Sequence, residues 1–176
     1  MDKILKIAKK HGLFIVEDAA QALGARYKGQ HAGTFGLASA ISFFPAKVMG
    51  CLGDAGGVLV NNDDLFHSIY QLHDHGRDTD GEVKRWGRNS RLDNIQAEIL
   101  NYKLKSYDKV ISRRREIAQM YQERLESLEE LQLPPSPSLS SDNFDVFQNY
   151  ELVANERDKL KLYLAKNNLG TLIQWG

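Results

Sequence analysis

Three polar residues lie beside short apolar runs in the first third of the chain, where they could take part in chemistry. Asp18 follows the apolar run 13–16, and Lys47 follows Ser42 by five residues in a glycine-rich segment. In α/β folds, ligand-binding groups gather at the carboxyl ends of buried strands. A partly desolvated lysine can act as an amine nucleophile, and nearby serine and glycine can bind a phosphate. The alternatives are that Asp18 caps a helix over 19–22 and that Lys47 is a solvated surface lysine.

Other clusters match recognised sites less well. The glycines between positions 50 and 57 fit neither the Walker phosphate-binding loop nor the dinucleotide-binding fingerprint. His67, His73, Asp74 and His75 lack a recognised metal-ligand spacing, so we expect no metal site. The basic run 113–115 is expected to be a solvated helix face.

Hydrophobic periodicity predicts the elements that position these residues. Helices are expected over 1–10, from Asp63 or Asp64 to 73, and over 92–104, 107–128 and 156–166, the last capped by Asn155. Strands are expected over 13–16, 38–44, 57–60 and 144–153, with loops over 45–56, 76–87 and 134–143. Strands that alternate with helices predict an α/β architecture.

Composition limits the broad class of protein. Lys plus Arg equals Asp plus Glu at 23 each, which argues against a general electrostatic role on nucleic acid or acidic membranes. Apolar runs such as 38–44 are too short to span a bilayer, and the N-terminus lacks the apolar core of a signal peptide. The single cysteine, Cys51, cannot form an internal disulfide. We therefore expect a cytoplasmic protein that binds neither nucleic acid nor membrane.

Taken in order, the motifs resemble those of the DegT/DnrJ/EryC1/StrS aminotransferases. These are pyridoxal 5′-phosphate (PLP) enzymes of fold type I that act on nucleotide-linked keto-sugars. The matching segments are 16–22 (Val-Glu-Asp-Ala-Ala-Gln-Ala), 27–36, 42–47 (Ser-Phe-Phe-Pro-Ala-Lys), 53–57, 87–93, 157–158 and 170–171. The resemblance covers essentially the whole chain. It implies the α/β fold of PLP-dependent transferase type I, like aspartate aminotransferase, with 1–100 in part of the large PLP-binding domain. Residues 101–176 would form connecting helices and part of the small C-terminal domain.

The resemblance also implies roles for individual residues near the cofactor. Lys47 would be the lysine of the internal Schiff base, and Asp18 would pair with the pyridinium nitrogen and keep the ring protonated. Gln21 would donate a hydrogen bond to the phenolic oxygen of PLP. Ser42 would bind the phosphate.

The resemblance also implies roles for two residues of the Gly-x-Asn-x-Arg segment. Asn89 would reach the phosphate in the neighbouring subunit of a homodimer with shared active sites, and Arg91 would bind an anionic part of the substrate. Relatives that run dehydrations carry histidine in place of the lysine, so Lys47 favours transamination. Family members are about twice this length, so the resemblance predicts a truncated chain that lacks part of the PLP site.

The implied reaction moves an amino group from an amino acid, expected to be glutamate, to a keto-sugar nucleotide. It would serve nucleotide-sugar or surface-polysaccharide biosynthesis. Two alternatives remain: a PLP-dependent sugar dehydratase of the same fold, and a non-catalytic remnant that acts only as a dimer partner.

Overall fold

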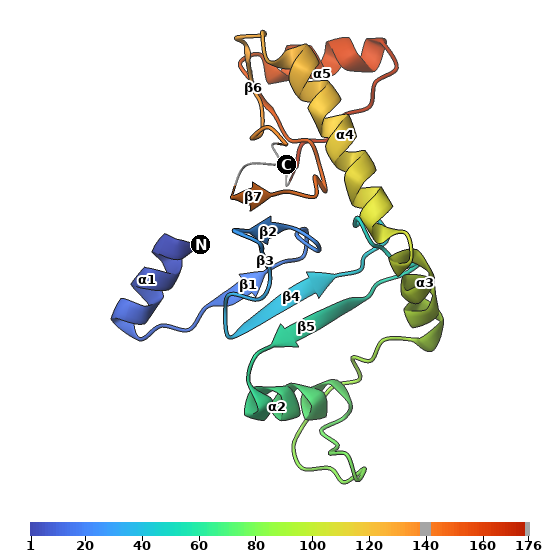
Figure 1. Ribbon diagram of the computed structural model, residues 1–176. Helices are drawn as coiled ribbons and strands as arrows, with labels where there is room; N and C mark the ends of the chain where they lie inside the picture. Colours follow the sequence, from blue (N-terminus) through green and yellow to red (C-terminus); the bar gives the residue numbers. More distant parts are fainter. Residues whose placement is uncertain (138–141, 175–176) are drawn as a thin grey trace.

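The structure is a computed structural model that describes residues 1–137 and 142–174 (Figure 1). In chain order its elements are α1 (Asp2–His11), β1 (Val16–Asp18), β2 (Arg26–Tyr27), β3 (Gln30–His31), β4 (Ala38–Ser42), β5 (Gly56–Val60), α2 (Asp63–His73), α3 (Asn94–Leu104), α4 (Tyr107–Leu125), β6 (Leu131–Gln132), β7 (Asn143–Phe144), β8 (Val153–Ala154) and α5 (Arg157–Lys166).

The central sheet has the strand order β1-β4-β5. Strands β1 and β4 are parallel, with Asp18 opposite Ala40, and their arrows point the same way in Figure 1. Strand β5 is antiparallel to β4, with Gly56 opposite Ser42. The carboxyl ends of β1 and β4 therefore lie at one edge of the sheet, as expected for an α/β fold.

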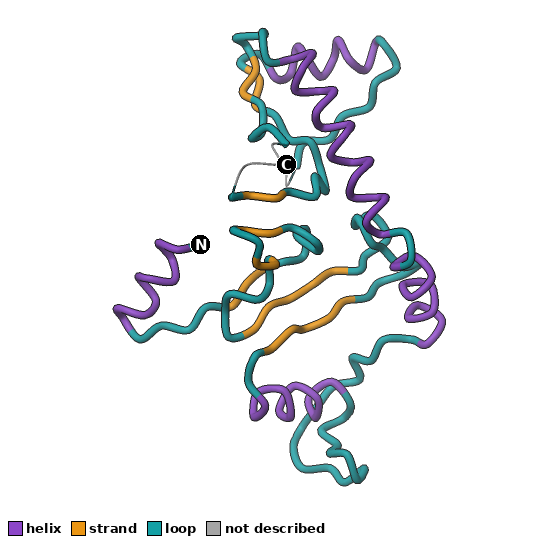
Figure 2. The backbone as a smooth tube through the Cα atoms, viewed as in Figure 1, coloured by secondary structure: helices purple, strands orange, loops and turns teal. Residues whose placement is uncertain are grey.

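A second sheet joins the two halves of the chain. Strand β2 pairs with β3 on one side and with β7 on the other, so that Arg26 lies opposite Phe144. The remaining pair, β6 and β8, lies with α5 near the far end of α4 (Figure 2). The part of the chain that follows α4 is thus attached to the first hundred residues by the pairing of β7 with β2.

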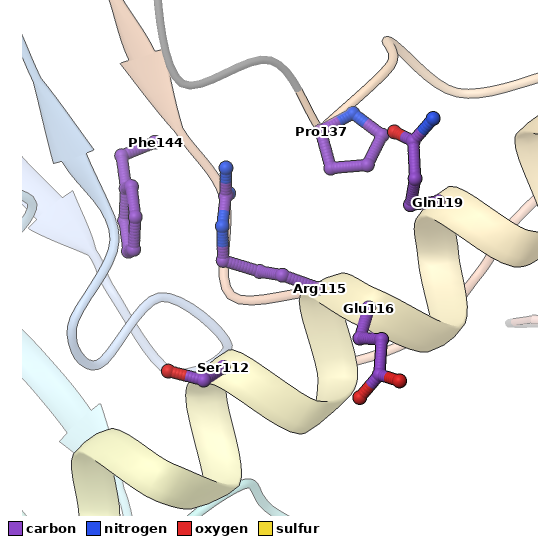
Figure 3. Close-up of a pocket in the computed structure, with 6 residues that line it drawn as sticks. All are labelled: Ser112, Arg115, Glu116, Gln119, Pro137 and Phe144. Carbon is purple, nitrogen blue, oxygen red and sulfur yellow. The ribbon is translucent and has the colours of Figure 1, made fainter.

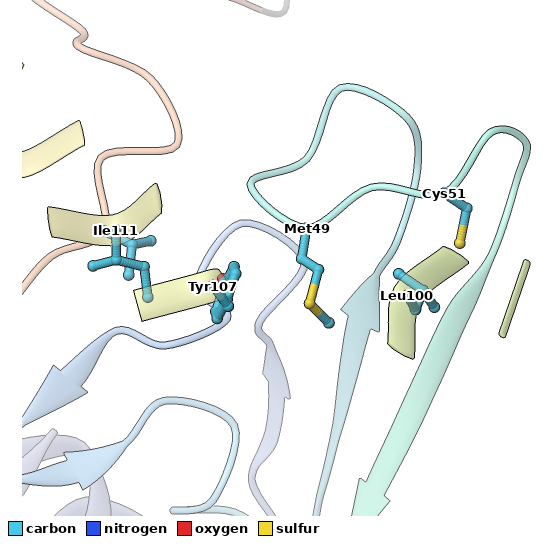
Figure 4. Packing of buried hydrophobic residues seen from close by; sticks show 6 residues of the cluster. Met49, Cys51, Leu100, Tyr107 and Ile111 are labelled. Atoms are coloured by element: carbon cyan, nitrogen blue, oxygen red, sulfur yellow. The ribbon is translucent and has the colours of Figure 1, made fainter. Parts of the chain in front are cut away.

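The apolar core lies between the loop after β4 and the helices α3 and α4. Met49 and Cys51 come from that loop, Leu100 from α3, and Tyr107 and Ile111 from α4 (Figure 4). Val146, from the segment after β7, is fully buried in the same cluster. The core therefore holds the segment that contains Lys47 against both long helices.

The five expected helices are all present, with shifted ends. Helix α2 is capped by Asn62, whose Oδ1 accepts a hydrogen bond from Leu65 N at 2.8 Å, and not by Asp63 or Asp64. Helix α5 begins after Glu156 and not after Asn155. Helix α3 begins two residues later than expected and α4 ends three residues earlier. The region 76–87 is a loop, as expected, with one isolated bridge.

Two of the expected strands are wrong. The first strand is Val16–Asp18 and not 13–16, because its partner β4 begins at Ala38, which pairs with Val16. The run is also not buried, since Phe14 is 83% exposed. Residues 144–153 form no continuous strand, and only the pieces in β7 and β8 find partners. The expected loop 134–143 lies partly outside the described residues.

The basic run on α4 is only in part a solvated face, which corrects the expectation. Arg115 reaches from α4 toward Phe144 (Figure 3), and its guanidinium carbon lies 4.0 Å from the ring centroid. Its Nη1 also donates to the Asp145 carbonyl at 2.6 Å. Arg113 remains exposed and pairs with Glu116 at 2.7 Å. Beside Arg115 is a cavity of about 300 Å³, lined by Ser112, Arg115, Glu116, Gln119, Pro137 and Phe144.

Large apolar side chains also remain on the surface. Trp86 is 96% exposed and Leu172 is 95% exposed, while Ile4 and Ile7 on α1 are each more than half exposed. None of the helices in 1–137 and 142–174 combines the length and apolar character needed to cross a bilayer.

Candidate active site

The turn that carries Lys47 begins where β4 ends. Ser42 is the last residue of β4, and its Oγ accepts a hydrogen bond from Phe44 N at 3.3 Å. Pro45 follows, and proline has no N–H with which to extend the strand pairing. The chain then turns, and Lys47 N donates to the Phe44 carbonyl at 2.9 Å. The hydroxyl of Ser42 and the amine of Lys47 are therefore placed at the same end of β4.

The rest of the loop folds back tightly on this turn. Cys51 N donates to the Phe43 carbonyl at 2.8 Å, and Phe43 N donates to the Ala55 carbonyl at 2.8 Å. A Cβ added at Gly50 would lie 2.5 Å from the carbonyl oxygens of both Phe44 and Pro45. Backbone atoms cannot yield to such a contact, so only glycine allows the loop to close.

An open cavity of about 1070 Å³ lies on the β5 side of this turn. Three of the residues expected in the site line it together: Ser42, Lys47 and Arg91. Its other lining residues are Ile41, Phe44, Asp54, Ala55, Gly56, Gly57, Val58, Val60, Phe66, Ile69, Tyr70, His73, Ser90, Leu92 and Asp93. The aromatic residues on α2 were not singled out from the sequence, because their helical spacing reads equally well as core packing.

Asp18 and Gln21 lie at the neighbouring strand end and are not among the described residues that line this cavity. Asp18 ends β1 with its side chain exposed, and its Oδ1 accepts a hydrogen bond from Ala20 N at 3.1 Å. The described stretch 19–22 is a turn and not a helix, so the helix-cap alternative is wrong. Within the described chain the Asp18 carboxylate has no ion-pair partner, which leaves it available to a cationic ligand.

Glu17 has a role that the sequence analysis missed. Its Oε1 accepts hydrogen bonds from Phe35 N at 2.6 Å and Gly36 N at 2.7 Å, and its Oε2 accepts one from Gly33 N at 2.8 Å. Side chains alternate along a strand, so Glu17 and Asp18 point to opposite faces. That alternation is the one signal in the sequence that could have predicted different roles for Glu17 and Asp18.

Asn89 and Arg91 lie on an exposed segment that follows the loop after α2. Asn89 forms a β-bridge with Asp74, and its Oδ1 accepts a hydrogen bond from Arg91 Nε at 3.1 Å. Arg91 Nη1 lies 3.3 Å from Asp74 Oδ1. Arg91 lines the cavity, whereas Asn89 is not among its described lining residues. Arg91 therefore shares the cavity with Lys47, and Asn89 is hydrogen-bonded to Arg91 beside it.

The groups at this sheet edge have the chemistry to hold a phosphorylated aldehyde with a cationic ring. A lysine amine can condense with the aldehyde, a serine hydroxyl can donate to a phosphate, and a carboxylate without an ion-pair partner can pair with a protonated ring nitrogen. Within 1–137 and 142–174 there is no group of three or more His, Cys, Asp or Glu side chains placed to hold a metal ion.

Comparison with protein families agrees with the resemblance seen in the motifs. The model of the DegT/DnrJ/EryC1/StrS aminotransferase family matches residues 1–175. A "pleiotropic regulatory protein" from Geobacillus stearothermophilus is 37% identical over 99% of this chain and 47% of its own. A UDP-2-acetamido-2-deoxy-3-oxo-D-glucuronate aminotransferase from Pseudomonas aeruginosa is 34% identical over 99% of this chain and 47% of its own.

Solved structures show the same partial fold. The structure of S. venezuelae DesV in complex with a ketimine intermediate superposes with a TM-score of 0.92 at 35% identity, and covers 99% of this chain and 46% of DesV. An aminotransferase of the same family from Brucella abortus gives 0.89 at 34% identity, over 99% and 46% of the two chains. The chain spans about half the length of the relatives it matches.

Proposed function

Because the chain belongs to the DegT/DnrJ/EryC1/StrS aminotransferase family, we propose that it acts in PLP-dependent transfer of an amino group to a nucleotide-linked keto-sugar. The observation that carries the proposal is the pairing of Ser42 and Lys47 in one open cavity at the end of β4. Asp18 ends the adjacent parallel strand, with its carboxylate exposed. Curated relatives named as sugar aminotransferases support the substrate class.

Each residue has a distinct role in this proposal. PLP supplies an electron sink when it is bound. The Lys47 amine would hold the cofactor and would take up and return a proton at the substrate carbon. The Asp18 carboxylate keeps the proton on the ring nitrogen. The Ser42 hydroxyl donates a hydrogen bond to the phosphate, and the Gln21 amide N–H donates one to the phenolic oxygen.

The substrates and assembly are proposed on the same basis. Glutamate is the amino donor, and Arg91 in the cavity wall contacts an anionic part of the sugar nucleotide. Asn89, which is exposed beside the cavity, binds the phosphate of the cofactor held by the partner subunit of a homodimer. Residues 1–100 belong to the large domain, and 101–176 to the connecting helices and small domain. The buried free thiol of Cys51 suits a reducing cytoplasm.

Borohydride reduction after PLP is added to the 176-residue chain tests the proposal. We expect one labelled peptide, with the label on Lys47, together with a visible absorbance band before reduction. Lys47→Ala should lose both signals. Lys47→Arg should lose them as well, because the guanidinium stays protonated and cannot attack a carbonyl.

The matched control is Lys84→Ala, since Lys84 is an exposed loop lysine that pairs with Asp78 and Glu82. This variant should keep the band and the label. Label on a different lysine, with an unchanged band in Lys47→Ala, would falsify the role of Lys47.

A further inference from the structure

The side chain of Gln148 contacts the backbone on both sides of Lys47, although it follows in the sequence by about a hundred residues. Its Oε1 accepts a hydrogen bond from Val48 N at 2.7 Å. Its Nε2 donates to the Ala46 carbonyl at 2.8 Å. One amide group thus forms hydrogen bonds with the N–H of the residue after Lys47 and with the C=O of the residue before it.

Gln148 is itself held by an unusual backbone. Phe147, the preceding residue, has a φ of 48° and is 5% exposed. A left-handed conformation is unfavourable for a bulky residue, so it persists only where the surroundings enforce it. Phe147 N donates to Asp145 Oδ1 at 2.9 Å, and Arg114 Nη1 donates to the carbonyls of Phe147 and Gln148 at 3.0 Å and 3.2 Å.

These contacts form a continuous connection from α4 to the Lys47 turn. Arg114 holds the backbone of Phe147 and Gln148, and Gln148 holds the backbone at Ala46 and Val48. The Lys47 side chain lines the large cavity. The turn is therefore fixed through its backbone, and among the described residues the Lys47 amine has no hydrogen-bond or ion-pair partner.

We propose that Gln148 is the positioning residue of the Lys47 turn: its amide fixes Ala46 and Val48 so that the Lys47 amine is presented to the cavity. The chemical use of that amine rests on the proposed function, whereas the fixed turn does not. The contact requires a donor and an acceptor on one planar group, which an amide provides. Leucine has neither, and glutamate keeps the acceptor but turns an oxygen toward the Ala46 carbonyl.

Three variants of the 176-residue chain test this role: Gln148→Leu, Gln148→Glu and the control Gln119→Leu. Gln119 is a glutamine on α4 whose Nε2 donates to Glu123 Oε1 at 2.9 Å, away from the turn. The first measurement is amide hydrogen exchange at Val48 relative to Cys51. Cys51 N bonds to the Phe43 carbonyl in the same loop, so it reports general loosening.

In Gln148→Leu we expect Val48 exchange to rise roughly two- to tenfold relative to Cys51, the range for loss of one hydrogen bond. In Gln148→Glu the Val48 N–H keeps an acceptor, so its exchange should stay slow. Gln119→Leu should match the unchanged chain. Equal acceleration at Val48 and Cys51, or none at Val48, in Gln148→Leu would overturn the proposal.

The second measurement is the share of borohydride-fixed PLP that is found on Lys47 compared with all other lysines. We expect this share to fall in both Gln148 variants and to hold in Gln119→Leu. Unfolded chains expose every lysine to PLP and would also lower this share, so the folded fraction of each variant is measured by circular dichroism and the shares are compared at equal folded fraction. An unchanged share despite faster Val48 exchange would overturn the positioning role. If the unchanged chain carries its label on another lysine, the proposed function fails, and Val48 exchange alone then decides whether Gln148 holds the turn.

Discussion

Two adjacent carboxylates, Glu17 and Asp18, have opposite surroundings. Glu17 accepts three backbone hydrogen bonds from residues 33–36, whereas Asp18 is exposed and accepts one from Ala20 N. The first acid fixes the loop that precedes β4, and the second is exposed. Residue type alone does not separate these roles, but position on the strand does.

We expect Glu17→Gln to lower the free energy of unfolding by about 2 kcal/mol. The amide replaces one accepting oxygen with a donor and removes the charge that strengthens the remaining hydrogen bonds. Asp18→Asn is the matched control, because an amide oxygen can still accept from Ala20 N, and its loss should be below about 0.5 kcal/mol. Urea denaturation of both variants measures the difference. Equal losses would show that Glu17 does not anchor the loop.

The positions of Asp18, Ser42 and Lys47 at or just after the ends of strands could be predicted from the sequence, because each lies at or after an apolar run, whereas their roles toward a cofactor stay predictions. The structure places Ser42 and Lys47 in one cavity and Asp18 on the neighbouring strand end. Gln148 could not be predicted, since its partners are backbone atoms about a hundred positions away. A hydrogen bond to backbone atoms can be made by any residue type, so the types of the contacted residues do not reveal it.

Among the helices, α4 is attached to the first half of the chain by its first residue. Tyr107 is buried, and its hydroxyl donates to the Leu23 carbonyl at 2.6 Å. Burial raises the pKa of Tyr107 to about 12 from the ordinary value of 10.0, because the phenolate would lose its hydration. The neutral hydroxyl is therefore part of the packing between α4 and the segment after β1.

This shift predicts a loss of stability at alkaline pH. The folded pKa is raised, so the stabilisation is complete below the unfolded value of 10.0 and is lost as pH rises toward about 12. We expect the free energy of unfolding to fall by about 1 kcal/mol between pH 9 and pH 11 through this group. Tyr107→Phe should be less stable at pH 8 but should lack this part of the decline. Parallel pH profiles for the two proteins would contradict the assignment.

Helices could be predicted better than strands because their signal is local. The periodic apolar positions in 92–104 and 107–128 gave two helices with ends within three residues. The segment 144–153 was misjudged because a strand of this length needs a partner along its whole course. Instead Val146 and Phe147 are buried in the core, and the left-handed backbone of Phe147 interrupts any extended pairing.

At the scale of the whole molecule, the chain covers 46% of DesV yet reproduces that part of the fold with a TM-score of 0.92. Several of its apolar side chains are exposed, such as Phe14 at 83% and Trp86 at 96%. Asn89 is exposed and is not among the described residues that line the cavity with Lys47.

We expect Asn89→Ala and Lys47→Ala subunits to complement each other in the homodimer that the proposed function implies. Each variant alone should be inactive or severely impaired. Random mixing makes half of the dimers mixed, each with one intact site of two, so activity should return to about a quarter of the unchanged level. Mixed and unmixed samples would be compared in a glutamate-dependent amination assay. No recovery after verified subunit exchange would place both residues in the same subunit's site.

The Gln148 contact also joins two segments that are synthesised at different times. A ribosome makes about 5–20 residues per second, so Gln148 is synthesised roughly 5–20 seconds after Lys47. During that interval the Lys47 turn has emerged without the amide that joins Ala46 to Val48. The backbone at Ala46 and Val48 therefore acquires these two contacts only after residue 148 has been made, about a hundred residues later than the turn itself.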